Sequence, residues 1–312
     1  MKKIITSASL VVFSVVAFAQ QDAQFTQNFM NRLAVNPGYA GINGSICAFT
    51  LYRTQWVGFD GQPQTGLLSL DAPIGAKKNM GLGLTIQTDK LGYMNNFYGK
   101  LAYSYHLPLG PGKLGLGLEA GAINNSINGA WLAPDGTDGA TDSNIPTSGT
   151  NKAGTTYDVG FGAYYDIPDK LYVGIASSHL PANPNGAYYD LARHYYITAG
   201  YDYAIGTSLV LKPSVFVKTD AASTAVDINL VAMYNSLVWA GVSYRLKDAI
   251  APMIGVQYKV GPGTLRFGYS YDVTTSAIKT YSSGSHEIML GYCFNVTPKP
   301  KVITKFYNVR FL

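Results

Sequence analysis

The residues most able to form a covalent link are the two cysteines. Cys47 lies near the start of the first of a long series of alternating segments, and Cys293 lies near the end of the last. If these two segments were neighbours in a closed sheet, both thiols would lie near the same end of it. Two interpretations stay open: a disulfide that closes the seam of the sheet, or two unpaired small apolar side chains.

Histidine-based chemistry finds little support. No combination with Ser and Asn predicts a hydrolase, and no Cys/His spacing is typical of a zinc site. The "GLGL" repeats at 81–84 and 115–118 neither complete GxGxxG nor open a helix, so they predict strands and not a nucleotide loop. We therefore expect no enzyme activity, no cofactor and no metal. The four histidines fall on separate segments or their edges: His106, His179, His194 and His286.

Oxygen ligands gather in "PDGTDGATDSN", where Asp135, Asp138, Asp142 and Asn144 lie close together. Such a loop could hold calcium, but its spacing does not follow the EF-hand pattern. A solvated surface loop is the preferred interpretation.

The amino-terminal residues have the pattern of a secretory leader. Lys2 and Lys3 precede an apolar run, and Ala17-Phe18-Ala19 resembles a cleavage site. We expect residues 1–19 to be a signal peptide. Without its two lysines the chain carries 23 − 2 = 21 basic and 18 acidic residues, a net charge of +3 that does not indicate nucleic-acid binding.

The rest of the chain alternates with period two. In "TLRFGYSYD", Leu265, Phe267 and Tyr269 share one face and Arg266 and Gly268 the other. Such strands, together with 24 Tyr, 34 Gly and 13% charged residues, are typical of a membrane-spanning β-barrel. Fourteen strands are predicted, at 46–56, 64–75, 80–89, 95–108, 112–126, 155–167, 171–180, 193–204, 208–218, 224–235, 237–247, 252–260, 263–274 and 284–296.

The connections between the predicted strands distinguish a membrane barrel from a soluble β-sandwich. Every second connection is a tight turn such as "LGPGK" or "IPDK". The longest connection, 127–154, is one of those that alternate with these tight turns. Outer-membrane barrels show this asymmetry, with short periplasmic turns and longer outer loops. We therefore predict an all-β, 14-stranded antiparallel transmembrane barrel in the outer membrane, with both termini in the periplasm.

Charged side chains fall on the polar phase of these strands, which would line the lumen. Both signs are mixed, so we expect them to neutralise one another and not to form an ion-selective pore. They are Lys100, Glu119, Asp158, Asp202, Lys212, Asp227, Arg245, Lys259, Arg266 and Glu287.

Residues 20–45 come before the first strand. Phe25, Phe29 and Leu33 are spaced at i, i+4 and i+8, which predicts a short amphipathic helix, and Asn36-Pro37-Gly38 would end it in a turn. Because a 14-stranded lumen is too wide for side chains alone to fill, we expect this segment to plug or cap the barrel. The chain thus divides into a leader 1–19, a plug 20–45, a barrel 46–296 and a periplasmic tail 297–312.

The stretch "QFTQNFMNRLAVNPGYAG" followed by "YRTQWVGFDGQPQTGLLSLDAPI" resembles the amino-terminal signature of the PorP/SprF family of Bacteroidetes outer-membrane proteins. The resemblance continues through "SHEIMLGYCF" to the "KFYNVRFL" tail. It implies a component of the type IX secretion system, related in fold to transporters of hydrophobic compounds and in some members serving gliding motility. The expected role is to scaffold the export or surface attachment of a secreted adhesin-like protein. A hydrophobic-ligand transporter with an amino-terminal hatch is the alternative.

The resemblance also implies partners: a secreted protein with a type IX C-terminal sorting domain, periplasmic ring or peptidoglycan-binding components, and outer-membrane lipid. Aromatic residues of the first outer turn could contact an outer partner or simply sit at the membrane interface. The basic, aromatic tail could dock a periplasmic partner or pack on the barrel base. The long outer loop, which matches no shared motif, could select the partner. The candidate partner-binding residues are Trp56, Val57, Phe59, Trp131, Lys305, Phe306, Tyr307, Arg310 and Phe311.

Overall fold

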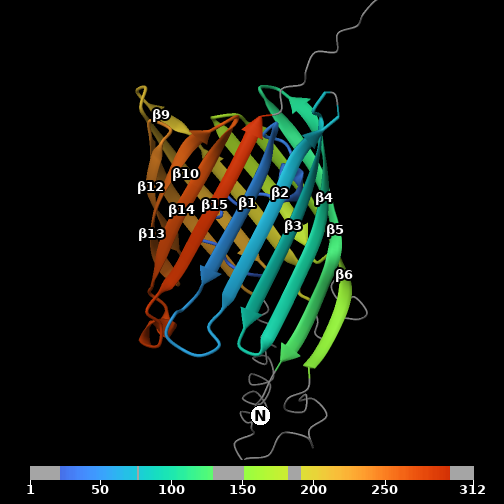
Figure 1. Ribbon diagram of the computed structural model, residues 1–312, viewed down its shortest axis with the longest axis vertical. Helices are drawn as coiled ribbons and strands as arrows, with labels where there is room; N and C mark the ends of the chain where they lie inside the picture. The colour runs from blue at the N-terminus through green and yellow to red at the C-terminus, as the bar shows by residue number, and fades with distance from the viewer. Residues whose placement is uncertain (1–21, 76, 129–150, 182–190, 296–312) are drawn as a thin grey trace, which may run out of the picture.

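The computed structural model describes residues 22–75, 77–128, 151–181 and 191–295. These residues form one antiparallel sheet that closes on itself, because β1 (Ser45–Thr54) pairs with both β2 (Gln64–Ile74) and β15 (Ser285–Asn295). Figure 1 shows the tilted strands wrapping around the lumen. Among the residues that the structure describes, no helix has the length and apolar content needed to cross a membrane.

Each strand pairs with the next along the chain, except that β8 pairs with β10 and not with β9. After β2 come β3 (Met80–Leu91), β4 (Met94–Leu109), β5 (Gly112–Asn128), β6 (Asn151–Ile167), β7 (Leu171–Ser178) and β8 (His194–Tyr201), followed by β9 (Tyr203–Ile205) and β10 (Leu209–Thr219). The circuit is completed by β11 (Thr224–Tyr234), β12 (Val238–Arg245), β13 (Ala249–Val260), β14 (Gly263–Thr274) and β15.

The predicted number of strands is confirmed, although fifteen labels appear. Strands β8 and β9 both pair with β10, so they are one barrel strand interrupted at Asp202. The interruption faces the Lys212–Pro213 part of β10, where Pro213 has no N–H to donate to the ladder. The barrel therefore has fourteen strands.

The strand alternation places apolar side chains on the outside. Phe267 is 45% exposed and Ile228 52% exposed, as a lipid-facing surface requires, whereas Asp227 on the opposite phase is 1% exposed. The two phases thus give the barrel an apolar outer wall and a polar inner one.

The two ends of the barrel differ. We call the end that holds Ser45, Asn295 and the hairpin turns after β2, β4, β6, β9, β11 and β13 the turn end, at the top of Figure 1. The opposite loop end carries the other connections, which include residues 55–63, 179–181, 191–193 and 275–284. The predicted leader and tail, and loop residues 129–150, lie outside the described residues.

Candidate functional site

Residues 22–44, here called the lumenal segment, run inside the barrel from its loop end to its turn end. Thr26 contacts side chains near the loop-end termini of β14 and β15. Gly41 donates its N–H to Asp71 Oδ2, 3.0 Å away, near the turn-end terminus of β2. The segment therefore spans the lumen lengthwise before the chain enters β1.

The predicted amphipathic helix is wrong. Over residues 26–30 the backbone forms a turn, in which the Met30 N–H donates to the Gln27 carbonyl at 3.0 Å. The Thr26 and Gln27 N–H groups donate to the two carboxylate oxygens of Glu287, at 2.8 and 2.7 Å. Acceptors on the barrel wall thus satisfy the backbone in place of a helix.

The predicted apolar face is nonetheless buried. Phe25, Phe29 and Leu33 are 5%, 9% and 3% exposed. Phe29 meets Trp239 edge to face, with ring centroids 5.8 Å apart, in an apolar cluster that reaches both sides of the barrel. Burial of these side chains holds the middle of the segment against the wall.

A buried ion network anchors the segment at the loop end. Arg53 pairs with Asp272 at 2.7 Å and with Glu287 at 3.1 Å, and its Nη1 also donates to Thr26 Oγ1 at 2.7 Å. Arg245 pairs with Asp272 at 2.9 Å. The charges of the wall are therefore satisfied partly by the segment itself.

The network extends to a third carboxylate, Asp227, which lies 3.0 Å from Arg245 Nε. Asn28 Nδ2 donates to Asp227 Oδ2 at 3.1 Å. Two guanidinium groups and three carboxylates are thus buried together. Such a network specifies one position for the segment more than it adds net stability, but removing one member is costly.

Other lumenal charges also pair as the mixed signs predicted. Lys100 lies 3.2 Å from Glu119 and 2.7 Å from Asp158, and Lys212 pairs with Asp202. These pairs confirm that the lumenal charges neutralise one another at these positions.

At the turn end the segment forms a short 3-10 helix, Pro37–Tyr39, in agreement with the predicted turn. Asn36 Oδ1 accepts the Gly38 N–H at 2.9 Å, and Asn36 Nδ2 donates to the carbonyls of Ala163 and Ile175. Asparagine in this position caps the turn and binds it to two strands.

The "GLGL" repeats make room for this turn. A Cβ atom at Gly117 would lie 2.3 Å from Gly38 N, and one at Gly81 would lie 1.9 Å from the Ala40 carbonyl oxygen. The lumenal residues of the repeats must therefore be glycine for the backbones to approach.

Arg32 joins the segment to the barrel wall at β7. Its guanidinium lies 3.9 Å from the centroid of the Tyr172 ring, and its Nε donates to the Phe29 carbonyl at 2.9 Å. A desolvated cation–π contact of this kind is stabilising.

The first described residue, Asp22, reaches a cluster near the loop end. His179 Nε2 lies 3.0 Å from Asp22 Oδ1, and His194 Nε2 accepts the Asp22 N–H at 3.1 Å. Tyr196 donates to the Asp22 carboxylate and Lys218 to its carbonyl.

This cluster was not predicted, because the four histidines fall on separate segments of the sequence. The signal was available: His179 follows β7 directly, and His194 opens β8 opposite Ser178. Residues at the adjoining ends of two antiparallel neighbours must lie close together. The position of Asp22 against them could not be read from local spacing.

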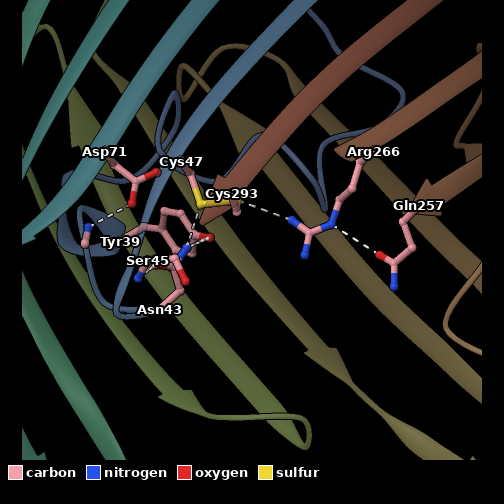
Figure 2. The surroundings of a disulfide bond; sticks show 9 residues. Tyr39, Asn43, Ser45, Cys47, Asp71, Gln257, Arg266 and Cys293 are labelled. Carbon is pink, nitrogen blue, oxygen red and sulfur yellow. Dashed lines mark hydrogen bonds between the residues drawn. A yellow bond between two sulfur atoms is a disulfide. The ribbon is translucent and has the colours of Figure 1, made fainter. Parts of the chain in front are cut away.

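The two cysteines meet on the lumenal side of the seam. Cys47 and Cys293 lie directly opposite each other on β1 and β15, and the structure joins them in a disulfide with a Cα–Cα distance of 4.1 Å. Figure 2 shows the bond between Asn43, from the lumenal segment, and Arg266 of β14. Their side chains donate to Cys47 Sγ and Cys293 Sγ at 3.4 and 3.5 Å.

The candidate partner-binding residues of the first loop lie at the loop end. Val57 exchanges backbone hydrogen bonds with Ser283 and Gly284, so this loop is joined to the connection between β14 and β15. Trp56 has a positive φ of 53°, and Phe59 is 37% exposed. The remaining candidates lie outside the described residues: Trp131, Lys305, Phe306, Tyr307, Arg310 and Phe311.

Similar folds occur among solved outer-membrane barrels. The Ralstonia pickettii toluene transporter TbuX is 14% identical with a TM-score of 0.51, covering 84% of this chain and 92% of its own. The CymD monoaromatic hydrocarbon channel is 13% identical with a TM-score of 0.53, covering 87% and 93%. The P. putida toluene transporter TodX is 11% identical with a TM-score of 0.52, covering 86% and 95%. At these identities the likeness shows the fold alone.

No curated protein sequence matches the chain. A family model does: type IX secretion system membrane protein PorP/SprF matches residues 17–292. This span includes the whole lumenal segment and nearly all of the barrel. Together, the match and the outer-membrane barrel fold confirm the predicted family and place the protein in the outer membrane. The chain belongs to the PorP/SprF family of type IX secretion system membrane proteins.

Proposed function

We propose that this protein is a closed outer-membrane scaffold that holds or helps deliver a secreted, adhesin-like protein of the type IX system. The observation that carries the proposal is the lumenal segment, which is bound to the wall at both ends of the barrel. A barrel filled in this way acts through its end surfaces and not through an open channel.

The two ends would then have different partners. In the proposed orientation the loop end faces the outside and binds a secreted protein with a type IX C-terminal sorting domain. The turn end faces the periplasm, together with the tail, and docks ring or peptidoglycan-binding components. The joined loops 55–63 and 275–284 support the outer role because their backbone hydrogen bonds make one continuous surface.

The test is affinity capture of the tagged barrel from mildly solubilised outer membranes, followed by mass spectrometry. The proposal expects a secreted protein bearing the sorting domain, with less of it on Phe59→Ala. Tyr203→Ala is the matched control because Tyr203 is exposed at the turn end and should leave capture unchanged. Recovery of the wild-type barrel without any secreted protein would contradict the proposal.

A hydrophobic-ligand transporter is the second candidate. Barrels of this fold include proteins described as toluene transporters and a monoaromatic hydrocarbon channel. Two cavities lie beside the lumenal segment, but each measures only about 40 Å³, enough for a few water molecules. Transport would therefore require the segment to move as a hatch. Uptake of toluene into proteoliposomes by the wild-type barrel, at a rate that depends on residues 22–41, would favour this candidate.

A further inference from the structure

The cluster around Asp22 has the geometry of a metal site. Asp22, His179 and His194 each offer one ligand atom, and these three atoms all lie within 4.8 Å of one another. The two imidazole rings meet edge to face with centroids 5.8 Å apart, and both histidines are 2% exposed. Two imidazole nitrogens and a carboxylate oxygen are a ligand set that Zn²⁺ and related divalent transition metals bind.

The outer nitrogens of both rings face an oxygen atom on the side away from Asp22. His179 Nδ1 lies 3.1 Å from Asp158 Oδ2, and His194 Nδ1 lies 2.9 Å from the Ala192 carbonyl oxygen. A carboxylate or carbonyl behind the distal ring nitrogen is the usual orientation device of metal-binding histidines. Both Nε2 atoms are thereby turned toward Asp22, from opposite ends of the connection between β7 and β8.

The surrounding charge can accommodate a dication. Asp22, Asp158 and Glu119 carry three negative charges near the cluster, against the two positive charges of Lys100 and Lys218. A metal ion would replace the proton between His179 Nε2 and Asp22 Oδ1, and that proton would pass to solvent. It would also take the lone pair of His194 Nε2, which now accepts the Asp22 N–H.

We propose that Asp22, His179 and His194 form a site for a divalent transition metal, with Zn²⁺ as its representative, that latches the start of the lumenal segment to the adjoining ends of β7 and β8. The inference goes beyond the proposed function and does not depend on cargo binding. Two of the ligands come from the wall and one ligand comes from the segment. The concentration of the metal ion would therefore control how readily the segment leaves the wall. Metal bound here stabilises the segment because the site is lost when the segment leaves.

The experiment uses the full barrel in detergent, carrying a tag without histidines and stripped with EDTA. Isothermal titration with ZnCl₂ should give one ion per barrel at micromolar or tighter affinity. His194→Ala and Asp22→Asn should each weaken binding by about 10-fold or more. His286→Ala is the matched control, because His286 pairs with Tyr269 on β14, away from the cluster.

Two further readouts keep the test decisive. Heat-modifiable migration in SDS gels shows that each variant still forms the barrel. Co²⁺ in place of Zn²⁺ should give a d–d absorption band that disappears in His194→Ala and persists in His286→Ala. Failure of the wild type to bind Zn²⁺ at micromolar concentration, or equal affinity in His194→Ala, would overturn the proposal.

Discussion

Glu287→Gln should loosen the loop-end anchor without opening the barrel. Glu287 is fully buried and accepts the N–H groups of Thr26 and Gln27 in addition to the guanidinium of Arg53. The amide keeps the size of the side chain but turns one acceptor into a donor, which must then face another donor. One charge-assisted hydrogen bond is lost, so the free energy of opening the segment should fall by about 3 kcal/mol.

Hydrogen exchange of the Thr26 and Gln27 amides measures this change directly. A fall of about 3 kcal/mol corresponds to exchange about two orders of magnitude faster, at unchanged protection of the strands. Asp169→Asn in the exposed turn after β6 is the matched control and should leave the segment unaffected. Unchanged exchange of the two amides in Glu287→Gln would refute the conclusion that this carboxylate anchors the segment.

Three other perturbations test separate contacts. Gly117→Ala should displace the 3-10 turn at a cost of about 1–3 kcal/mol, because the added Cβ would lie 2.3 Å from the backbone of the turn. Tryptic cleavage within the segment should therefore become faster. Gly99→Ala is the control and should not change it, because a Cβ there would lie 3.7 Å from its nearest neighbour. Phe29→Ala should leave a cavity beside Trp239 and destabilise the closed segment by about 3 kcal/mol or more, measured as faster exchange of the same segment. Reduction of the Cys47–Cys293 bond should make the barrel unfold in SDS at lower temperature, since the cross-link constrains the unfolded chain by about 2–5 kcal/mol. Complete alkylation of the native protein without reductant would show that the bond is absent.

The barrel could be predicted because short stretches of sequence determine its strands and turns. A period of two sets which face each residue occupies, and tight turns limit each strand, so 263–274 was predicted with the bounds that β14 has. Other boundaries differ by a few residues. The predicted strand 252–260 begins earlier, at Ala249, and β13 contains Pro252 opposite Val242.

The interior could be predicted only in part, because its contacts are non-local. The spacing of Phe25 and Phe29 identified residues that are buried, but not the backbone that buries them. The predicted helix is not favoured, because Glu287, 260 residues from Gln27 along the chain, supplies acceptors for the N–H groups at the start of the segment. The position of Asp22 could not be predicted for the same reason, since nothing in the sequence near Asp22 points to His179.

Planar-bilayer conductance of the purified barrel tests most directly whether the lumenal segment closes the lumen, on which the scaffold proposal depends. The intact protein should show no steady ionic conductance, and deletion of residues 22–41 should produce open channels from barrels that still migrate as folded. A wild-type barrel that conducts as well as the deletion variant would contradict the account, because the segment would then leave a continuous passage through the membrane.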